Sequence, residues 1–176
     1  MLPAGTVIGA VGDDGVEFFR GIPFAQSPTG SRRLKPPLRL QSFDSGSVLA
    51  TGVGPACPQM TAIDATPLLL DVLALPGVQE TLFFGSTLGD EREDCLTISV
   101  MRPKGTRAAT NAKLPVLFYI FGGDFETGSP QMYNGPVLIP RLVAQGKPII
   151  FVAVNYRLEA FGFLGGIRCW RMGLLT

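Results

Sequence analysis

One stretch of the chain, from Leu114 to Val154, constrains the fold more than any other. It opens with the apolar run Leu114–Phe121 and closes with a second apolar run, Pro148–Val154. Runs that are apolar on both faces are typical of strands inside an α/β sheet. Between them, Val137–Gln145 predicts a short helix that Gly146 closes. A strand, a helix and a strand in this order predict a βαβ unit with parallel strands, and hence an α/β fold.

The rest of the chain gives weaker signals. Thr6–Val11 and Val16–Phe19 are β-prone and flank an Asp- and Gly-rich turn, so they predict a hairpin. Asp94–Met101 alternates well enough for a strand. Pro67–Pro76 allows two or three helical turns between its prolines. We find no repeat, no low-complexity tract and no domain boundary.

Composition narrows the function. The 176 residues are 46% hydrophobic, enough for a sizeable core, and the net charge of +1 is scattered. No basic stripe favours nucleic-acid binding, and no apolar run approaches the roughly 20 residues that span a bilayer. The first residues lack the basic and apolar regions of a secretory signal, so the chain is cytosolic or its sequence begins after the signal. Three cysteines without a CxxC pair, and no histidine, predict no metal site and no cofactor.

The strand Leu114–Phe121 runs directly into a paired glycine, Gly122–Gly123, followed by Asp124 and Phe125. Such a loop can aim backbone N–H groups at the oxyanion that forms during acyl transfer, because glycine permits unusual φ values and close approach. An ordinary glycine turn after a strand is the alternative. A phosphate loop is not expected, because GxxxxGK[ST] and GxGxxG are both absent.

Five further motifs occur in an order and spacing that resemble one family. They are Phe19–Ala25 (FRGIPFA), Leu34–Pro37 (LKPP), Ala56–Gln59 (ACPQ), Glu93–Val100 (EDCLTISV), and Asn155–Arg157 (NYR) with Phe161–Leu164 (FGFL). Together they resemble the type-B carboxylesterases and lipases of the α/β-hydrolase fold over residues 5–166. The Phe121 before the paired glycine is most similar to the fungal lipase and esterase branch.

The resemblance implies a serine acyl-enzyme mechanism acting on a small ester or a lipid ester. In that scheme the N–H groups of Gly123 and Asp124 form the oxyanion hole, and Gly122 and Phe125 support the loop. Members of the family are mostly secreted. The resemblance therefore implies an extracellular location, whereas the residues of this chain, which show no secretory signal, leave its location unknown.

The resemblance also implies a disulfide between Cys57 and Cys95, with Cys169 left free. Two reduced, buried thiols are the alternative. In the lipase branch the loop between these cysteines is a lid over the acyl pocket. Here that loop is rich in apolar residues, and a loop packed on the core is the other interpretation. The residues concerned are Leu68, Leu69, Leu70, Leu73, Leu75, Phe83 and Phe84.

The chain departs from the family at its chemistry. None of its eight serines has glycine at both −2 and +2, and there is no histidine to act as a base. Asp124 stands where glycine or alanine is common, and its carboxylate would repel an oxyanion unless it is turned away. The last ten residues match the family poorly.

We therefore expect an incomplete α/β-hydrolase: a β-hairpin, a lid-bearing loop and the first strands of the central sheet. Residues 1–176 would form the N-terminal part of a single domain, with the triad beyond them. The alternative is a truncated, inactive hydrolase-like chain that acts as a binding module or has no independent function. A sheet cut at this point should leave the edge of Pro148–Val154 and the faces of Leu114–Phe121 uncovered.

Overall fold

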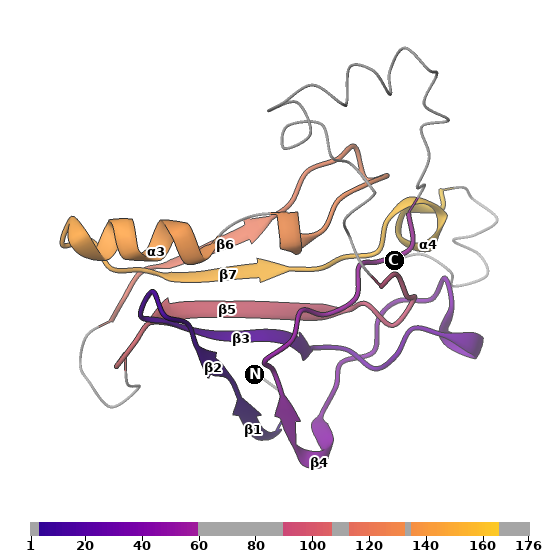
Figure 1. Cartoon of the computed structure of the whole chain (residues 1–176). Helices are drawn as coiled ribbons and strands as arrows, with labels where there is room; N and C mark the ends of the chain where they lie inside the picture. Colours follow the sequence, from indigo (N-terminus) through magenta and orange to yellow (C-terminus); the bar gives the residue numbers. More distant parts are fainter. Residues whose placement is uncertain (1–3, 60–89, 107–112, 133–134, 166–176) are drawn as a thin grey trace.

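The computed structural model describes residues 4–59, 90–106, 113–132 and 135–165. Figure 1 shows a central sheet with helix α3 beside it and a second, smaller sheet near the N-terminus. The strands are β1 (Ala4–Ile8), β2 (Ala10–Val11), β3 (Val16–Pro23), β4 (Ser42–Leu49), β5 (Thr97–Pro103), β6 (Val116–Ile120) and β7 (Ile150–Val154). The helices are the 3₁₀ turns η1 (Gly30–Arg32) and η2 (Pro130–Met132), and the α-helices α3 (Gly135–Ala144) and α4 (Glu159–Phe163).

The central sheet has five strands in the order β2-β3-β5-β7-β6, and all neighbours are antiparallel except β6 and β7. Strands β6 and β7 run parallel, with Leu117 opposite Phe151 and Tyr119 opposite Ala153, and α3 connects them. The predicted βαβ unit is therefore confirmed. The sheet is mixed and contains a βαβ unit, so the architecture is α/β as the sequence predicts.

Helix α3 ends as its sequence predicts. Gly146 has a φ of +70°, its N–H donates to the carbonyl of Val143 (3.0 Å), and the N–H of Lys147 donates to the carbonyl of Leu142 (2.8 Å). These two bonds form a Schellman motif, which requires the left-handed conformation that glycine adopts readily. The helix begins at Gly135, two residues before the predicted start.

Only the part of the predicted hairpin nearest the turn is confirmed. Ala10 pairs with Phe18 across the turn, which the carboxylate of Asp14 stabilises by accepting the N–H of Val16 at 3.1 Å. Thr6, however, belongs to β1, which pairs parallel with β4, so that Thr6 lies opposite Ser47. Two segments about forty residues apart meet here, and local β-propensity carries no information about such a partner.

The two faces of the sheet are covered differently. On one face, α3 packs on a cluster that contains Val16, Met101, Ile139 and Phe151. On the other, Phe43 and Ala50 pack with Ile22, and Phe19 and Val100 lie against them. Because side chains alternate along a strand, Phe18 faces α3 while its neighbour Phe19 faces the β1–β4 side.

The position of β6 in the sheet differs from the one that the sequence predicts. The sequence predicts a strand buried in the middle of the sheet and an open edge at Pro148–Val154, but β7 lies between β5 and β6, and β6 forms the edge. Val116, Phe118 and Ile120 are 57%, 53% and 61% exposed. The strand is apolar on both faces as predicted, yet no described element covers the face that carries these three side chains.

Several expectations fall outside the described residues. They are the Pro67–Pro76 helical turns, the lid interpretation of the loop after Cys57, Cys169, and the last ten residues. Among the helices of the described ranges, none is long and apolar enough to cross a membrane.

Candidate active-site loop

The loop that follows β6 is fixed first at its strand end. Phe121 is fully buried, its ring stacks on Tyr156 at 4.3 Å between centroids, and its carbonyl accepts the Tyr156 hydroxyl at 2.7 Å. Tyr156 comes two residues after β7, the parallel neighbour of β6. The end of one parallel strand therefore holds the end of the next, and the loop leaves the sheet from a fixed point.

Gly123 begins a sharp turn that no other residue could make. Its φ is +139°, and a Cβ built there would lie 2.0 Å from the carbonyl oxygen of Thr127. The carbonyl of Gly123 accepts the N–H groups of Glu126 (2.9 Å) and Thr127 (3.0 Å), which closes the turn on itself. Gly122, in contrast, has nothing within 4 Å of its virtual Cβ. Of the paired glycines, only Gly123 is sterically required.

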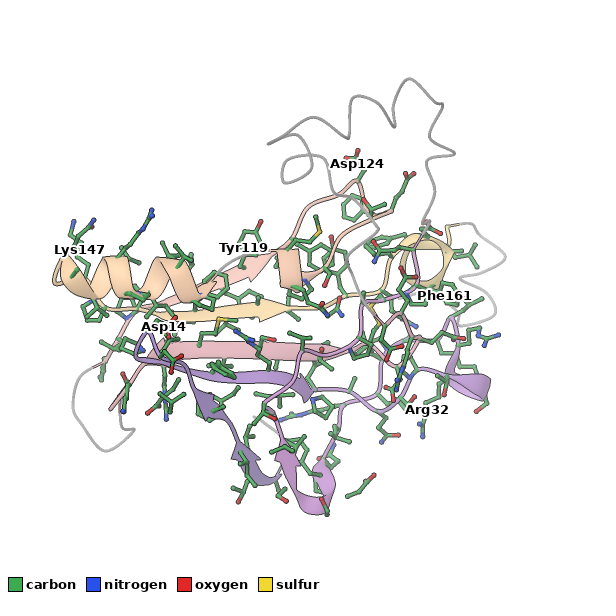
Figure 2. The ribbon with its side chains drawn as sticks, viewed as in Figure 1. Asp14, Arg32, Tyr119, Asp124, Lys147 and Phe161 are labelled. Atoms are coloured by element: carbon green, nitrogen blue, oxygen red, sulfur yellow. A yellow bond between two sulfur atoms is a disulfide. The ribbon has the colours of Figure 1, made fainter. Side chains whose placement is uncertain are left out.

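The next two residues keep the backbone left-handed. Asp124 has a φ of +55° and Phe125 a φ of +65°, which is uncommon for residues with a side chain. The structure holds Phe125 from the direction of α4. Its carbonyl accepts the N–H of Glu159 at 2.8 Å, and its ring lies 4.6 Å from that of Phe163. In Figure 2 the Asp124 side chain lies at the outer end of the loop and points away from the sheet.

Two backbone donors of this turn have no acceptor in the part of the chain that the structure describes. Within the described ranges, the N–H groups of Gly123 and Asp124 donate to no other residue. Unengaged, neighbouring N–H groups on a rigid turn are the kind of feature that can stabilise an oxyanion, since the donors are fixed before charge develops.

The far end of the loop is held by Gln59, a residue to which the sequence assigned no role. Its side-chain amide makes a two-way clamp on buried Gly128: Oε1 accepts the Gly128 N–H at 2.8 Å, and Nε2 donates to the Gly128 carbonyl at 3.1 Å. Nε2 also donates to the carbonyl of Cys57 at 3.0 Å. The signal was present in the ACPQ motif, but its partner lies 69 residues away and no local pattern names it.

The disulfide implied by the family resemblance is confirmed. Cys57 and Cys95 are bonded, their Cα atoms are 5.1 Å apart, and both are fully buried beside Leu96 and Ala25. Cys57 of this bond is two residues before Gln59, whose side chain clamps Gly128. The bond therefore ties the start of β5 to the loop that follows β6.

Asn155 and Arg157 of the NYR motif, which follows β7, differ in the partners that they find among the described residues. Asn155 donates its side-chain Nδ2 to the carbonyl of Pro55 (2.9 Å) and its backbone N–H to that of Thr97 (2.9 Å). Arg157 forms no ion pair with a described residue, and its buried Nη1 has no hydrogen-bond partner among these residues. Burial disfavours the charged guanidinium and lowers the pKa of Arg157.

The described residues do not assemble a catalytic triad. The sequence has no histidine. Ser129, next to the loop, is fully buried, and its hydroxyl accepts the N–H of Gln131 at 3.2 Å. Among the described residues no group of Cys, Asp and Glu side chains could hold a metal ion.

Comparisons with known proteins show the family to which the chain belongs. The sequence model of the Carboxylesterase family matches residues 1–166. The secreted triacylglycerol lipase LIP1 of Gibberella zeae is 48% identical over 171 residues, and Secreted lipase 1 of Botryotinia fuckeliana is 46% identical over 170. These alignments cover 94% and 93% of this chain but only 27% and 28% of the two lipases.

The crystal structure of Aspergillus niger EstA superposes with a TM-score of 0.69 at 29% identity, over 95% of this chain and 27% of EstA. The chain belongs to the carboxylesterase family, and its fold is that of the esterases and lipases in it. It spans about a quarter of the length of the relatives that it matches.

Proposed function

We propose that this chain is the N-terminal part of a single-domain carboxylic ester hydrolase and supplies its oxyanion hole. The observation that carries the proposal is the loop after β6. Its backbone is left-handed at Asp124 and Phe125, and it is clamped at Phe121 and Gly128. The N–H groups of Gly123 and Asp124 have no acceptor among the described residues. Membership of a family with secreted triacylglycerol lipases supports an ester or lipid ester as the substrate.

In this scheme a serine attacks the carbonyl carbon of the ester, and the carbonyl oxygen becomes an oxyanion. The N–H groups of Gly123 and Asp124 donate to that oxygen, with Gly122 and Phe125 supporting the turn. A donor of this kind lowers the barrier by about 3–4 kcal/mol. The outward position of the Asp124 carboxylate keeps its negative charge away from the oxyanion. The serine, the acid and the histidine lie outside these 176 residues, so the chain alone should not turn over esters.

The disulfide supports an oxidising compartment for the protein, because such bonds persist in secreted proteins and are rare in the cytosol. Two of the relatives are named as secreted. We propose an extracellular location on these two grounds.

A second candidate is a catalytically inactive member of the family, and one observation favours it. Asp124 places a negative charge within one residue of the glycine that makes the turn, in a chain that lacks histidine. If the side chain turned inward, the oxyanion would meet repulsion in place of stabilisation.

A chimera separates the two candidates. Residues 1–166 of this chain would replace the matching part of the Gibberella zeae lipase, which supplies the rest of the domain, and kcat would be measured on a short activated ester. We expect a folded, active chimera that reacts stoichiometrically with a fluorophosphonate, while the 176-residue chain alone does not react.

The variant Asp124→Gly in the chimera decides the role of the carboxylate. It keeps the N–H donor and removes the charge, so the proposal expects an unchanged or modestly higher kcat. If the chimera is inactive and Asp124→Gly raises its kcat at least about 10²-fold, the result would support the inactive candidate. A folded chimera that stays inactive in both forms would show that this loop is not an oxyanion hole.

A further inference from the structure

The face of the sheet that α3 covers changes character along its length. Figure 1 shows α3 running beside one part of β5 and β7 and stopping short of the end of these strands. Under α3 the face is apolar, with Val16 on β3 and Met101 on β5. Beyond the first turn of α3 the same face is polar. It carries Arg20 on β3, four residues after Val16, and Ser99 and Thr97 on β5, two and four residues before Met101.

These polar residues line a cavity of about 350 Å³, which we call the Arg20 cavity. Asn155 forms its inner wall, is only 2% exposed, and is held by its bonds to Pro55 and Thr97. Gln131 of η2 donates to the carbonyl of Gly54 and joins the segments on the opposite side. The cavity therefore has walls fixed by hydrogen bonds and a volume in the range of small-molecule sites.

Arg20 is the one cation among the described residues that line this cavity, and it forms no ion pair with a described residue. Its guanidinium lies 4.3 Å over the ring of Phe18, and its Nε is buried without a hydrogen-bond partner. Other arginines on the same sheet and its neighbouring loops are neutralised: Arg102 pairs with Glu17 at 2.7 Å, and Arg33 with Glu93 at 2.8 Å. A guanidinium without an ion-pair partner can bind an anion through its terminal Nη groups, which donate to carboxylate oxygens.

The surroundings of Arg20 favour an anion, but one of low charge. Pro136 in the first turn of α3 lines the cavity, so the positive end of the helix dipole faces it, and the hydroxyls of Thr97 and Ser99 add donors. On the other side of Phe18, Asp13 and Asp14 line an adjoining cavity that also reaches Arg20. Their negative charge opposes a dianion, so a single negative charge fits the site best.

The rest of the lining is apolar and includes Met101, Met132 and Val53. An arginine fork matches the two oxygens of a carboxylate, and the thioether and aliphatic surface suits a short hydrocarbon chain. We infer that the Arg20 cavity binds a short-chain monocarboxylate, with its carboxylate on the Arg20 guanidinium and its carbon chain against Met101 and Met132. This site lies on the sheet face beside α3, and its lining does not include the Gly122–Phe125 turn.

Titration calorimetry with hexanoate, hexanamide and inorganic phosphate tests the inference on the 176-residue chain. Hexanamide has the same shape without the charge, and phosphate has charge without the hydrocarbon chain. We expect hexanoate to bind at one site per chain, with a Kd at least about tenfold lower than that of either control, as the loss of charge-assisted hydrogen bonds implies. Equal affinities for hexanoate and hexanamide, or no binding of hexanoate, would overturn the inference.

Substitutions of Arg20 test whether hexanoate binds in the Arg20 cavity. Arg20→Gln should raise the Kd for hexanoate at least about tenfold and remove its advantage over hexanamide. Arg141→Gln is the matched control, because it deletes an exposed arginine near the other end of α3 and should leave the Kd unchanged. Unchanged binding in Arg20→Gln would refute the assignment. If Arg20→Gln does not fold, Arg20→Lys takes its place: it keeps the charge and loses the fork, and its Kd should rise severalfold, whereas an unchanged Kd would refute the role of the fork.

Discussion

At the scale of single residues, the loop after β6 depends on one glycine of an adjacent pair. The backbone of Gly123 lies in a region closed to residues with a Cβ, and the space beside it is filled by the Thr127 carbonyl. Gly122 meets neither restriction. The motif carries two glycines, but the stability of the turn depends on the second.

The matched pair Gly123→Ala and Gly122→Ala tests this difference. Gly123→Ala should lower the free energy of unfolding by at least about 2 kcal/mol, because it adds a steric clash to an unfavourable φ. Gly122→Ala should change it by less than about 1 kcal/mol. Urea denaturation followed by circular dichroism measures both. Equal losses in the two variants would contradict the steric account of the turn.

The ion pair of Glu17 and Arg102 gives the sheet a pH dependence. Burial of the Glu17 carboxylate raises its pKa, but hydrogen bonds from Arg102 and from the N–H of Gly105, with the charges of Arg102 and Lys104, outweigh it. The net effect lowers the pKa from its ordinary value of 4.5. A carboxyl whose pKa is depressed by folding stabilises the fold above its unfolded pKa and loses this contribution as the pH falls through the folded pKa.

We therefore expect Glu17→Gln to be destabilising at pH 7 and to reduce the loss of stability on acidification below about pH 4.5. Thermal unfolding of both proteins between pH 3 and pH 7 gives the comparison, with Asp44→Asn on the exposed face of β4 as a surface control. A constant difference between wild type and Glu17→Gln across this range would refute the linkage.

At the scale of elements, the disulfide and the Gln59 clamp act as one connection between the segment before β5 and the loop after β6. Cys57 and Cys95 are 38 positions apart, and closing a loop of this length restricts the unfolded chain. The bond also fixes the backbone that presents Gln59 to Gly128.

Replacing both cysteines with alanine should lower the free energy of unfolding by about 3 kcal/mol on the chain-entropy model. The double variant is compared with the oxidised wild type by urea denaturation, and the reduced wild type serves as the control that keeps the side chains. Peptide mapping without reductant should find Cys57 linked to Cys95 and Cys169 free. A linkage that includes Cys169, or an unchanged stability in the double variant, would contradict this account.

Elements defined by local pattern were predictable, and elements defined by distant partners were not. The hydrophobic run of β7 and the glycine after α3 specify their own structures, because a buried strand and a Schellman motif need only their own residues. The pairing of β1 with β4 joins segments 38 to 41 residues apart, and the clamp between Gln59 and Gly128 joins residues 69 apart. The predicted positions of β6 and β7 in the sheet were wrong for the same reason. Apolar composition indicates that a strand packs on both faces, but it does not indicate which strands are its neighbours.

At the scale of the whole molecule, the sheet has one edge that is poorly protected. Strand β6 pairs with β7 on one side only among the described elements, and Val116, Phe118 and Ile120 form an exposed apolar row beside this edge. Exposed edges with apolar side chains pair with other chains unless a charge, a proline or a covering element prevents it. The alignments cover 27% of LIP1 and 27% of EstA, so about three quarters of each relative has no counterpart in this chain. We propose that sequence of this kind covers the β6 edge in the complete domain.

We expect the isolated chain to associate through β6, and Phe118→Lys to reduce this association. A lysine in the middle of the edge strand places a charge where a second strand would pair, a device by which natural edge strands avoid aggregation. Leu49→Lys is the matched control: Leu49 is 70% exposed, and it lies at the end of β4 in the other sheet. Sedimentation velocity over a range of concentrations should show oligomers for the wild type and for Leu49→Lys, and mostly monomer for Phe118→Lys. A wild-type chain that sediments as a monomer and melts sharply would instead identify a self-sufficient domain and favour the binding-module candidate over the partial hydrolase.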